Sequence, residues 1–477
     1  MNVPSYEFLA FAAVVALVIN VSRSPRWRRP VWLVANLAFV LSLSHDPVQL
    51  APFAGLLAFG FASVKLMERF KRKALFFLLV AGIVIAFCIL KRYTFIPHAF
   101  ELPYVYLTVG MSYVFFRIVH LVIDAYQDAL PDRVDLLSYL NFTLNFTTLV
   151  AGPIQLYQDY RRTESATPPQ LDLRTAGEAL ERILVGFFKV SVVSPLLGAA
   201  HERLTAVSGD LSWEQRVVAA ALLLSVYPVY LYFNFSGYTD FVIGVARFLR
   251  LVLPENFNKP FSALGFLDFW GRWHMTLANW VKTYVYSPLV IAMMRRFPSP
   301  RVEPILGVIA YFVAFFLVGV WHGQTSMFVF LGVLLGLGVS VNKLFQIAMI
   351  RRLGRARYRA LCAQPLSAAV SRGLTFLWFA FSSVWFWSSW AQLGHFIALF
   401  GGAGIALAFT LVLVAATILL SLPSILDHWL FAGGEPQRTW IGSIYAKTAW
   451  YTVLAVLTIS VTAVLNAPAP HIVYRAF

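Results

Sequence analysis

The chain is built from apolar runs that are long enough to cross a lipid bilayer and that recur along its whole length. The hydrocarbon core offers no water to the backbone, so such runs must satisfy their peptide groups internally, as α-helices do. Only 13% of the 477 residues are charged, about half the share of a soluble domain, and the mean hydropathy is +0.71. The sequence therefore predicts an all-α polytopic integral membrane protein, with a single membrane-embedded domain over residues 1–477.

We expect about eleven spans. The first apolar run is followed, not preceded, by arginines, which favours an uncleaved first span with its N-terminus outside. Alternating basic and near-neutral loops place residues 23–29 and 65–73 on the cytoplasmic side. The spans are drawn from the runs at 6–21, 31–44, 50–64, 74–90, 104–122, 175–200, 215–233, 304–321, 326–347, 371–390, 396–421 and 445–465.

Four segments between these spans are irregular. Residues 137–151 are apolar but end at Gly152-Pro153, a break that predicts a re-entrant or interfacial segment. Residues 155–174 are polar and predict a loop, and the two prolines and two asparagines of 254–260 predict a turn-rich connection. Residues 262–285 are only partly apolar and predict an interfacial or half-buried helix.

The net charge of +16 is concentrated in short basic clusters at residues 23–29, 65–73, 295–301 and 351–359. The excess of Lys and Arg in cytoplasmic loops is sufficient to explain these clusters. A docking surface for an anionic cytosolic donor is a compatible second interpretation. Nucleic acid is not indicated as a partner, because the charge is not gathered in one soluble module.

The sequence contains few motifs of familiar soluble enzymes. The two cysteines, Cys88 and Cys362, form neither a ligand cluster nor a disulfide framework, and no metal site is predicted. There is no Gly-x-Ser-x-Gly elbow, His-Glu-x-x-His motif or P-loop. Without a serine or cysteine nucleophile, a direct transfer assisted by histidine is the more economical chemistry.

Two histidines, each directly after a tryptophan, are the strongest candidates for such chemistry. His322 follows Trp321 within an apolar stretch, and His274 follows Trp273. An imidazole at membrane depth is uncommon and indicates a functional site, and the neutral form favoured there can accept a proton. For a single histidine, a structural role would be the commoner explanation. A water-filled pore would also explain the polar Gln324 and its neighbours after His322.

Helical spacing through residues 262–285 predicts one face that carries Trp270, Trp273, His274 and two apolar residues. Other polar residues inside the apolar segments favour structural roles. Arg117, His120 and Asp124 share a helical face, Asp240 and Arg247 are spaced to form an ion pair, and Lys189 could snorkel or pair.

An ordered series of motifs resembles the membrane-bound O-acyltransferases, and within them the bacterial alginate O-acetyltransferases and teichoic-acid D-alanyl transfer proteins. The motifs are Asn-Phe-Ser-Gly-Tyr-Thr-Asp at 234–240, Glu-Asn-Phe-Asn-Lys-Pro-Phe at 255–261, Phe-Trp-Gly-Arg-Trp-His-Met-Thr-Leu at 269–277 and Trp-His-Gly at 321–323. Val-Ala-Gly-Pro-Ile at 150–154 extends the resemblance, so the motif-bearing core covers about 137–340. The aromatic ending at 474–477 is a faint further likeness.

The resemblance implies a ring of helices around a central funnel and a narrow tunnel. By motif, His322 matches the principal catalytic histidine and would be the general base toward the acceptor hydroxyl. His274 matches the second histidine and would position or polarise the donor. The tunnel walls would include Trp270, Trp273 and Trp321, with Gln324 among its polar lining, and Asn256 and Asn258 would shape its mouth.

The implied reaction passes an acyl group, acetyl or D-alanyl-like, from a cytoplasmic thioester across the bacterial inner membrane to a hydroxyl of an envelope polysaccharide. The donor would be acetyl-CoA or an acyl carrier protein, with no tightly bound cofactor. An extracytoplasmic or membrane-anchored partner of the acyltransferase or esterase kind is also implied. The alternative is a transporter or channel with a polar tunnel and no chemistry.

The sequence departs from the pattern of this branch at three places. Asn234 stands where an Asp is usual, Lys282-Thr283 replaces a common Arg-Asp pair, and Leu289-Val290-Ile291 replaces the Leu-Gly-Gly of the alginate enzymes. The last departure weakens a specific alginate assignment, whereas the 256–261 and 273–275 motifs lean toward the D-alanyl group.

Overall fold

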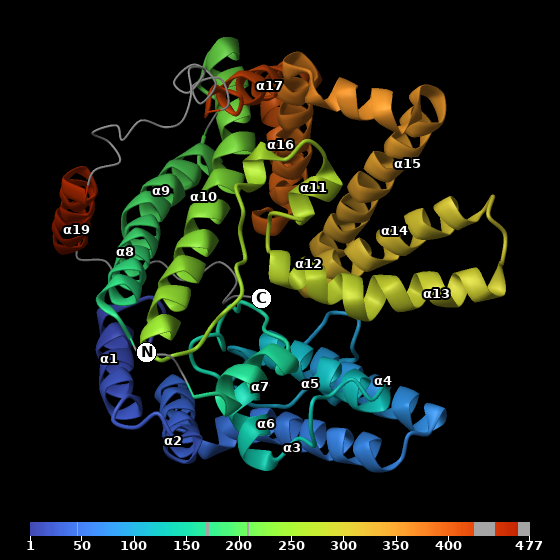
Figure 1. Ribbon diagram of the computed structural model, residues 1–477. Coiled ribbons are helices and arrows are strands. Elements are labelled where there is room, and N and C mark those ends of the chain that lie inside the picture. The colour runs from blue at the N-terminus through green and yellow to red at the C-terminus, as the bar shows by residue number, and fades with distance from the viewer. Residues whose placement is uncertain (45, 168–170, 208, 424–443, 466–477) are drawn as a thin grey trace. The chain divides into compact units, whose positions relative to one another are not determined.

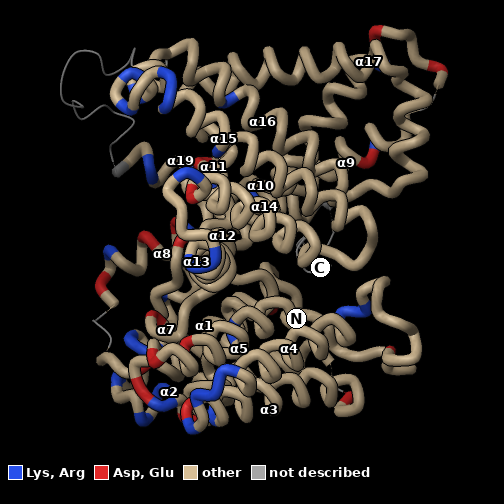
Figure 2. The backbone as a smooth tube through the Cα atoms, turned by 90° about the vertical axis from the view of Figure 1, so that its right-hand side faces the viewer, with Lys and Arg blue, Asp and Glu red and all other residues tan. Residues whose placement is uncertain are grey.

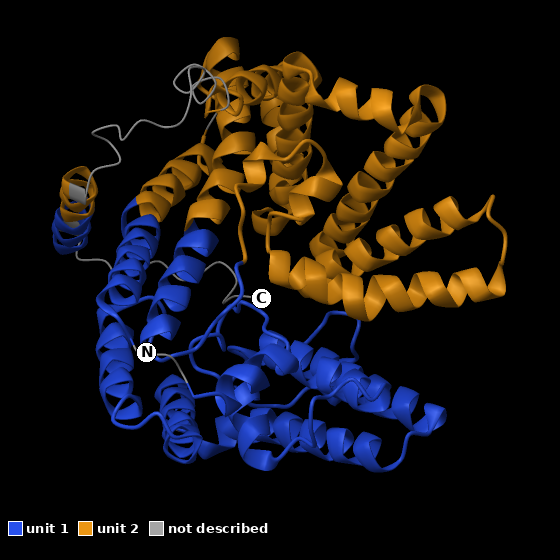
Figure 3. Cartoon of the chain, viewed as in Figure 1, with its two compact units in different colours: residues 1–192, 234–255, 454–477 blue, residues 193–233, 256–453 orange. Residues whose placement is uncertain are grey.

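The computed structural model describes residues 1–44, 46–167, 171–207, 209–423 and 444–465 (Figure 1). These residues form helices and connecting segments without a β-strand, so the predicted all-α architecture is confirmed for the described part of the chain. The predicted aromatic ending at 474–477 lies outside the described residues. Contacts divide the chain into two compact units (Figure 3). Unit 1 comprises residues 1–192, 234–255 and 454–477, and unit 2 comprises residues 193–233 and 256–453.

Unit 1 contains the N-terminal helices and the second half of α10. Its helices are α1 (Tyr6–Ile19), α2 (Pro25–Leu43), α3 (Pro47–Arg69), α4 (Lys73–Leu90), η1 (His98–Phe100), α5 (Met111–Tyr126), α6 (Leu136–Thr143), α7 (Tyr157–Ser165) and α8 (Leu173–Phe188). A π-turn, η2 (Lys189–Val193), leads from α8 into α9.

Unit 2 contains the central and C-terminal helices. These are α9 (Ser194–Thr205), the first half of α10 (Trp213–Phe248), η3 (Pro260–Ser262), α11 (Phe266–Trp270), α12 (Met275–Val281), the π-turn η4 (Lys282–Tyr286), α13 (Ser287–Arg296), α14 (Glu303–Trp321), α15 (Ser326–Ala363), α16 (Pro365–Trp387) and α17 (Trp390–Leu419). Helix α19 (Ile444–Leu465) begins in unit 2 and ends in unit 1.

Helix ends in both units follow ordinary capping chemistry. Asp135 caps α6 by accepting from the Ser138 backbone N–H, and Asp172 caps α8 in the same way. Ser389 forms a capping box with Gln392 at the start of α17. Charged residues concentrate at helix ends and connections, and the middles of the helices are largely free of them (Figure 2). This distribution matches the apolar spans predicted from the sequence.

Eight of the described helices are long and apolar enough to span a membrane, which confirms the polytopic class. The predicted spans represented by α1, α2, α5 and α16 lie outside this set, and α1 has only 14 residues. The count of about eleven spans therefore stays a prediction.

Two secondary-structure predictions for unit 1 were wrong, the start of the 104–122 span and the 155–174 loop. Helix α5 begins only at Met111, after Gly110 adopts a positive φ of 78°, a conformation that glycine tolerates best. In the 137–151 segment, predicted to be re-entrant or interfacial, α6 ends at Thr143 and turns continue to the Gly152-Pro153 break, so that prediction is not contradicted. The predicted 155–174 loop contains α7, a polar helix whose Tyr157 and Tyr160 are buried.

The buried Arg117 explains why the chain after α6 can remain irregular. Its guanidinium donates to the carbonyl oxygens of Phe142 (3.1 Å), Thr143 (2.7 Å) and Thr148 (2.9 Å). These bonds satisfy carbonyls that a continued helix would have satisfied itself. His120 likewise accepts from the Tyr157 backbone N–H at 3.1 Å. Asp124, on the same helical face, accepts from Gln158 at 2.6 Å. These contacts agree with the structural roles favoured for Arg117, His120 and Asp124.

The predicted ion pair between Asp240 and Arg247 was wrong. Asp240 instead pairs with Arg182 (3.0 Å) and Lys189 (2.7 Å) from the α8 segment, whereas Arg247 pairs with Glu178 at 3.4 Å. Helices α8 and α10 pack so closely that both residues find partners across the helix interface rather than along α10. A Cβ at Gly186 would come within 2.5 Å of the Phe241 backbone nitrogen.

Candidate functional site

All of the site residues predicted from the sequence belong to unit 2. The structure corrects the predicted local fold of residues 262–285, which include Trp270, Trp273 and His274. Residues 262–285 are not one helix, because α11 ends at Trp270 and α12 begins at Met275. His274 lies between them in the left-handed region, with φ 44° and ψ 49°, which is uncommon for a residue with a side chain. The predicted single face of Trp270, Trp273 and His274 was therefore wrong.

The turn before α12 is held by the segment that precedes it in the sequence. The Met275 backbone N–H donates to the Asn256 carbonyl at 3.0 Å, and the Asn258 N–H donates to the Arg272 carbonyl at 2.9 Å. Phe257 and Trp273 form an isolated antiparallel bridge between the same two segments. The connection at 254–260 is non-helical, as predicted, and its backbone groups pair with the histidine-bearing turn instead of continuing a helix.

The Asn256 side chain fixes the His274 ring. Its oxygen accepts from the Thr276 backbone N–H (3.2 Å) and from the Thr276 hydroxyl (2.8 Å), and it lies 3.1 Å from His274 Nδ1. A backbone N–H only donates, so the shared Asn256 atom is the amide oxygen, and Nδ1 must carry the proton between them. In neutral His274 the lone pair is therefore on Nε2.

His322 reaches the same proton arrangement through its own helix. It is the C-cap of α14, and its Nδ1 lies 2.6 Å from the Val318 carbonyl oxygen, one helical turn earlier. A carbonyl oxygen only accepts, so Nδ1 again carries the proton and Nε2 the lone pair in the neutral ring. Both imidazoles are buried, with 0% and 1% of the residue exposed, and His274 lies within electrostatic reach of His322.

Close helix packing positions the end of α14. A Cβ added at Gly319 would overlap the Cα of Gly332 in α15, so the two helices touch at their backbones. The Gly323 backbone lies against the Phe328 ring, where a Cβ would overlap ring carbons. The His322 ring is edge-on to Phe386 of α16, with ring centroids 5.0 Å apart. Neighbouring helices thus enclose the imidazole.

The three predicted tunnel tryptophans have different surroundings. Trp273 is 1% exposed and stacks on Phe269, with ring centroids 5.6 Å apart. Trp321 lies against the His322 ring at 4.7 Å. Trp270 lines a cavity of about 260 Å³. Other residues around this cavity include Lys282, Tyr286, Tyr311 and Phe315.

The remaining predicted residues divide into one buried and two exposed side chains. Asn256 is fully buried, whereas Asn258 and Gln324 are exposed. The structure therefore brings the Asn256 side chain to His274, whereas Asn258 bonds to Arg272 through its backbone N–H. The roles of Asn258 and Gln324 stay predictions.

Sequence reasoning missed three partners of the histidines. Thr276 stands in the quoted Trp-His-Met-Thr motif, so its position after His274 could have drawn attention. The Val318 carbonyl follows from helical i, i−4 spacing. Phe386 belongs to no motif, and only the packing of α16 reveals it.

Comparisons with known proteins agree with this site. A sequence model described as the membrane-bound O-acyltransferase family matches residues 65–371, which include both histidines. The chain is 31% identical over 226 residues to a teichoic acid D-alanyltransferase of Bacillus subtilis, covering 47% of this chain and 55% of the relative. A probable alginate O-acetylase of Pseudomonas aeruginosa is 25% identical over 280 residues, covering 56% and 51%.

A third relative is a peptidoglycan O-acetyltransferase of Helicobacter pylori, 32% identical over 213 residues, covering 44% of this chain and 38% of the relative. The chain thus spans about half the length of the first two curated relatives and less of the third. The family match covers well over half of the chain, and it confirms the resemblance seen in the motifs. The chain belongs to the membrane-bound O-acyltransferase family.

Proposed function

We propose that the protein is an O-acyltransferase that passes an acetyl or D-alanyl-like group from a cytoplasmic thioester to a hydroxyl of an extracytoplasmic polysaccharide. The observation that carries the proposal is that the two buried imidazoles have the same tautomer in their neutral form. Each has its Nδ1 proton held by an acceptor, which leaves Nε2 as the atom that takes up or releases a proton. Family membership and the names of the relatives support acyl transfer as the chemistry.

In the proposed reaction, Nε2 of His322 is the general base. It removes the proton from the acceptor hydroxyl while the hydroxyl oxygen attacks the thioester carbonyl carbon. The C–S bond then breaks, the donor leaves as a thiol after taking up a proton, and an ester remains on the acceptor. The Val318 carbonyl supports this role, because it holds the ring in one tautomer and stabilises the imidazolium formed after proton transfer.

His274 is proposed to position the donor. In the neutral ring, Nε2 has no proton to donate, so it cannot polarise a thioester carbonyl by a hydrogen bond. It can accept from an N–H of the donor, and a pantetheine arm supplies such groups in both acyl-coenzyme A and acyl carrier proteins. The sequence left two roles open for His274, positioning the donor or polarising its thioester carbonyl. The tautomer favours positioning the donor.

The cavity beside Trp270 is proposed as part of the donor path. Its volume of about 260 Å³ suits a narrow acyl or pantetheine segment, and Lys282 at its lining suits an anionic donor. We further propose that this protein has the funnel and narrow tunnel that the family resemblance implies, with Trp273 and Trp321 in the tunnel wall. Asn256 and Asn258 would lie at the mouth, and Gln324 in the polar lining.

The proposed setting is the bacterial inner membrane. There the basic clusters predicted to be cytoplasmic would favour coenzyme A phosphates or an acidic carrier protein. An extracytoplasmic or membrane-anchored partner would complete the transfer to the polymer, unless transfer is direct.

The deciding experiment compares His322→Ala with His395→Ala. His395 is an exposed histidine in α17, so its loss removes an imidazole outside the site. Purified proteins in liposomes would receive radiolabelled acetyl-coenzyme A or acyl carrier thioester, together with the partner and acceptor, and thiol release and polymer acylation would be measured. We expect His322→Ala to lose about 10²–10⁴-fold in rate and His395→Ala to retain activity.

Equal activity of the two variants would remove His322 as the base. If the unsubstituted protein consumes neither thioester but transports a solute, the transporter interpretation replaces acyl transfer.

A further inference from the structure

Unit 1 carries an apolar groove far from either histidine in the sequence. The groove has a volume of about 670 Å³ and lies among α1, α8 and α10. Its lining includes alanines of α1, Leu180 of α8 and Phe248 of α10. From Leu9 to Asn20 at its two ends, α1 rises about 17 Å at 1.5 Å per residue. This length is close to half of the roughly 30 Å hydrocarbon core of a bilayer.

One end of the groove is polar and is built by Asn20. The Asn20 amide donates to the carbonyls of Ala16 (2.7 Å) and Phe248 (2.9 Å), which joins the ends of α1 and α10. Its oxygen accepts from Nε of Arg250 at 2.7 Å. Arg250 therefore has its guanidinium fixed where the apolar groove ends.

A second arginine at this end is buried without a matching anion. Arg28 is only 2% exposed, and its Nη2 donates to the Arg250 carbonyl at 3.4 Å. Its Nε and Nη1 are buried and have no hydrogen-bond partner among the described residues. A buried charge in this state is costly unless an anion or other acceptor satisfies it.

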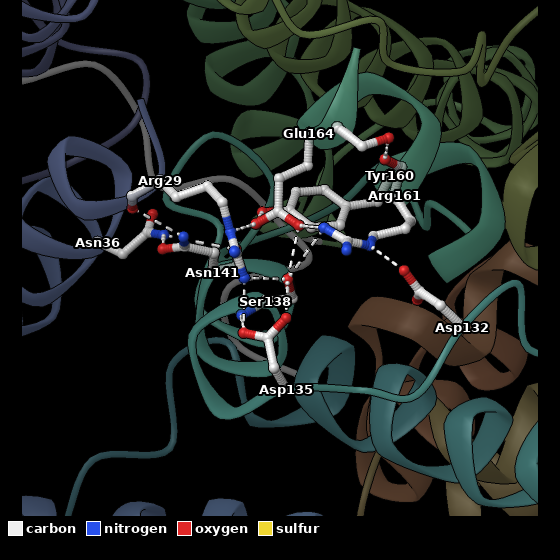
Figure 4. Close-up of polar contacts among 10 residues, drawn as sticks. Arg29, Asn36, Asp132, Asp135, Ser138, Asn141, Tyr160, Arg161 and Glu164 are labelled. Carbon is white, nitrogen blue, oxygen red and sulfur yellow. Dashed lines mark hydrogen bonds and ion pairs between the residues drawn. The ribbon is translucent and has the colours of Figure 1, made fainter. Parts of the chain in front are cut away.

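The carboxylate that acts electrostatically on Arg28, Glu164, is committed to other partners, as Figure 4 shows. The carboxylate of Glu164 lies 2.7 Å from Arg161 Nη1 and 3.4 Å from Arg29 Nε. It also accepts from the hydroxyls of Ser138 (2.6 Å) and Tyr160 (3.2 Å). Glu164 acts on Arg28 only through space, and Arg250 opposes it with a like charge.

Further groups around this end do not supply the missing negative charge. Asp135 and Asp132 face Arg29 and Arg161 in the same network, at 2.6 Å and 2.8 Å. Arg23 adds another positive charge near Arg250. Tyr160 is the remaining titratable group that influences Arg28. The polar end of the groove therefore has an excess of positive charge.

We propose that the groove binds an anionic phospholipid, with an acyl chain along α1 and the headgroup phosphate on Arg28 and Arg250. Guanidinium groups bind phosphate oxygens through several parallel N–H donors. The apolar groove has the length of one leaflet and accounts for the acyl chain, and the arginines account for the negative head. This site does not depend on the acyl-transfer proposal.

The test measures lipid retained by the full-length protein. Protein would be purified from nanodiscs that contain equal phosphatidylglycerol and phosphatidylcholine, and native mass spectrometry would count the bound lipids. Two variants attack different parts of the site: Arg28→Gln removes the buried charge, and Ala16→Phe fills the apolar groove and leaves every arginine in place. Arg26→Gln is the matched control, because Arg26 is an exposed arginine of the same cluster.

We expect the unsubstituted protein and Arg26→Gln to retain phosphatidylglycerol in preference to phosphatidylcholine. Arg28→Gln should lose this preference by about tenfold or more, the scale of a lost hydrogen bond to a charged group. Ala16→Phe should lose it because the acyl chain no longer fits the groove. Equal retention of the two lipids by the unsubstituted protein would overturn the proposal.

Unchanged lipid selectivity in both Arg28→Gln and Ala16→Phe would also overturn the proposal.

A measurement with inorganic phosphate distinguishes a lipid headgroup from a free anion. If phosphate alone raises the Tm as much as phosphatidylglycerol vesicles do, the site binds a free anion and the lipid assignment is wrong.

Discussion

The two buried histidines reach the same tautomer by different routes. His322 is held within a single helix, by the carbonyl of Val318 four residues earlier. His274 is held by Asn256, 18 positions earlier, and by a turn in which its own backbone is left-handed. The first arrangement needs only that α14 remain helical, whereas the second needs two separate segments to stay paired. At His322, a substitution should therefore be able to lower the reaction rate without loosening the local fold. At His274, a substitution that releases the ring should disturb the local fold and donor binding together.

The largest effect should come from His322→Gln. A glutamine amide can still donate to the Val318 carbonyl, but it cannot take a proton from an acceptor hydroxyl. The acyl-transfer rate should fall by about 10²–10⁴-fold with little change in Tm. Rates from radiolabelled thioester and the Tm in detergent would be measured on the same preparation. If the amide variant retains more than a tenth of the activity, the imidazole is an anchor and not the base.

A smaller but broader effect should follow from Asn256→Ala. The substitution removes the acceptor shared by His274 and Thr276 and leaves buried donors unsatisfied, at a cost of about 1–3 kcal/mol in stability. We expect a lower Tm and a higher KM for the thioester donor, because the ring that positions the donor is released.

The matched control for that substitution is Asn258→Ala. The Asn258 side chain is exposed, and its backbone N–H makes the bond to Arg272, so alanine should change the Tm little; the control is for stability, because Asn258 is itself proposed to lie at the tunnel mouth. Should the two variants lower the Tm equally, the Asn256 side chain would have no special part in holding His274.

The same contrast explains what the sequence could predict. Apolar runs of span length predict helices because the membrane leaves the backbone no alternative, and the helical i−4 spacing places a carbonyl beside His322. The break at 254–260 was predicted because proline and asparagine disfavour a continuing helix. In each case the information lies within a few residues of the feature.

The features that escaped prediction depend on distant residues. The bend at 271–274 forms because the Asn256 segment accepts and donates hydrogen bonds there, and helical periodicity alone pointed to one continuous helix. The partners of Asp240 lie on α8, so spacing along α10 could not reveal them. Arg28 looked like one member of a basic loop until its burial was known.

Helix packing gives a third way to separate the two histidines. Gly319→Ala places a methyl group against the Gly332 backbone, and overpacking of this kind costs about 1–3 kcal/mol. The shift should displace His322, one turn farther along, and leave the Asn256 contacts of His274 unchanged. Activity should fall with little change in the KM for the donor. Gly394→Ala is the control, since a Cβ there meets nothing within 4 Å.

The smallest effect should come from Ser326→Ala, at the start of α15. The Ser326 hydroxyl accepts from Trp390 Nε1 at 2.8 Å and ties α15 to α17 next to the His322 turn. Its loss should lower the free energy of unfolding by about 0.5–1.5 kcal/mol, read as a small fall in Tm, and leave the rate almost unchanged. Thr325→Ala, at the neighbouring exposed position, makes no such link and should leave the Tm unchanged. A large loss of rate in Ser326→Ala alone would mean that His322 depends on tertiary contacts as much as His274 does, and the distinction between the two settings would fail.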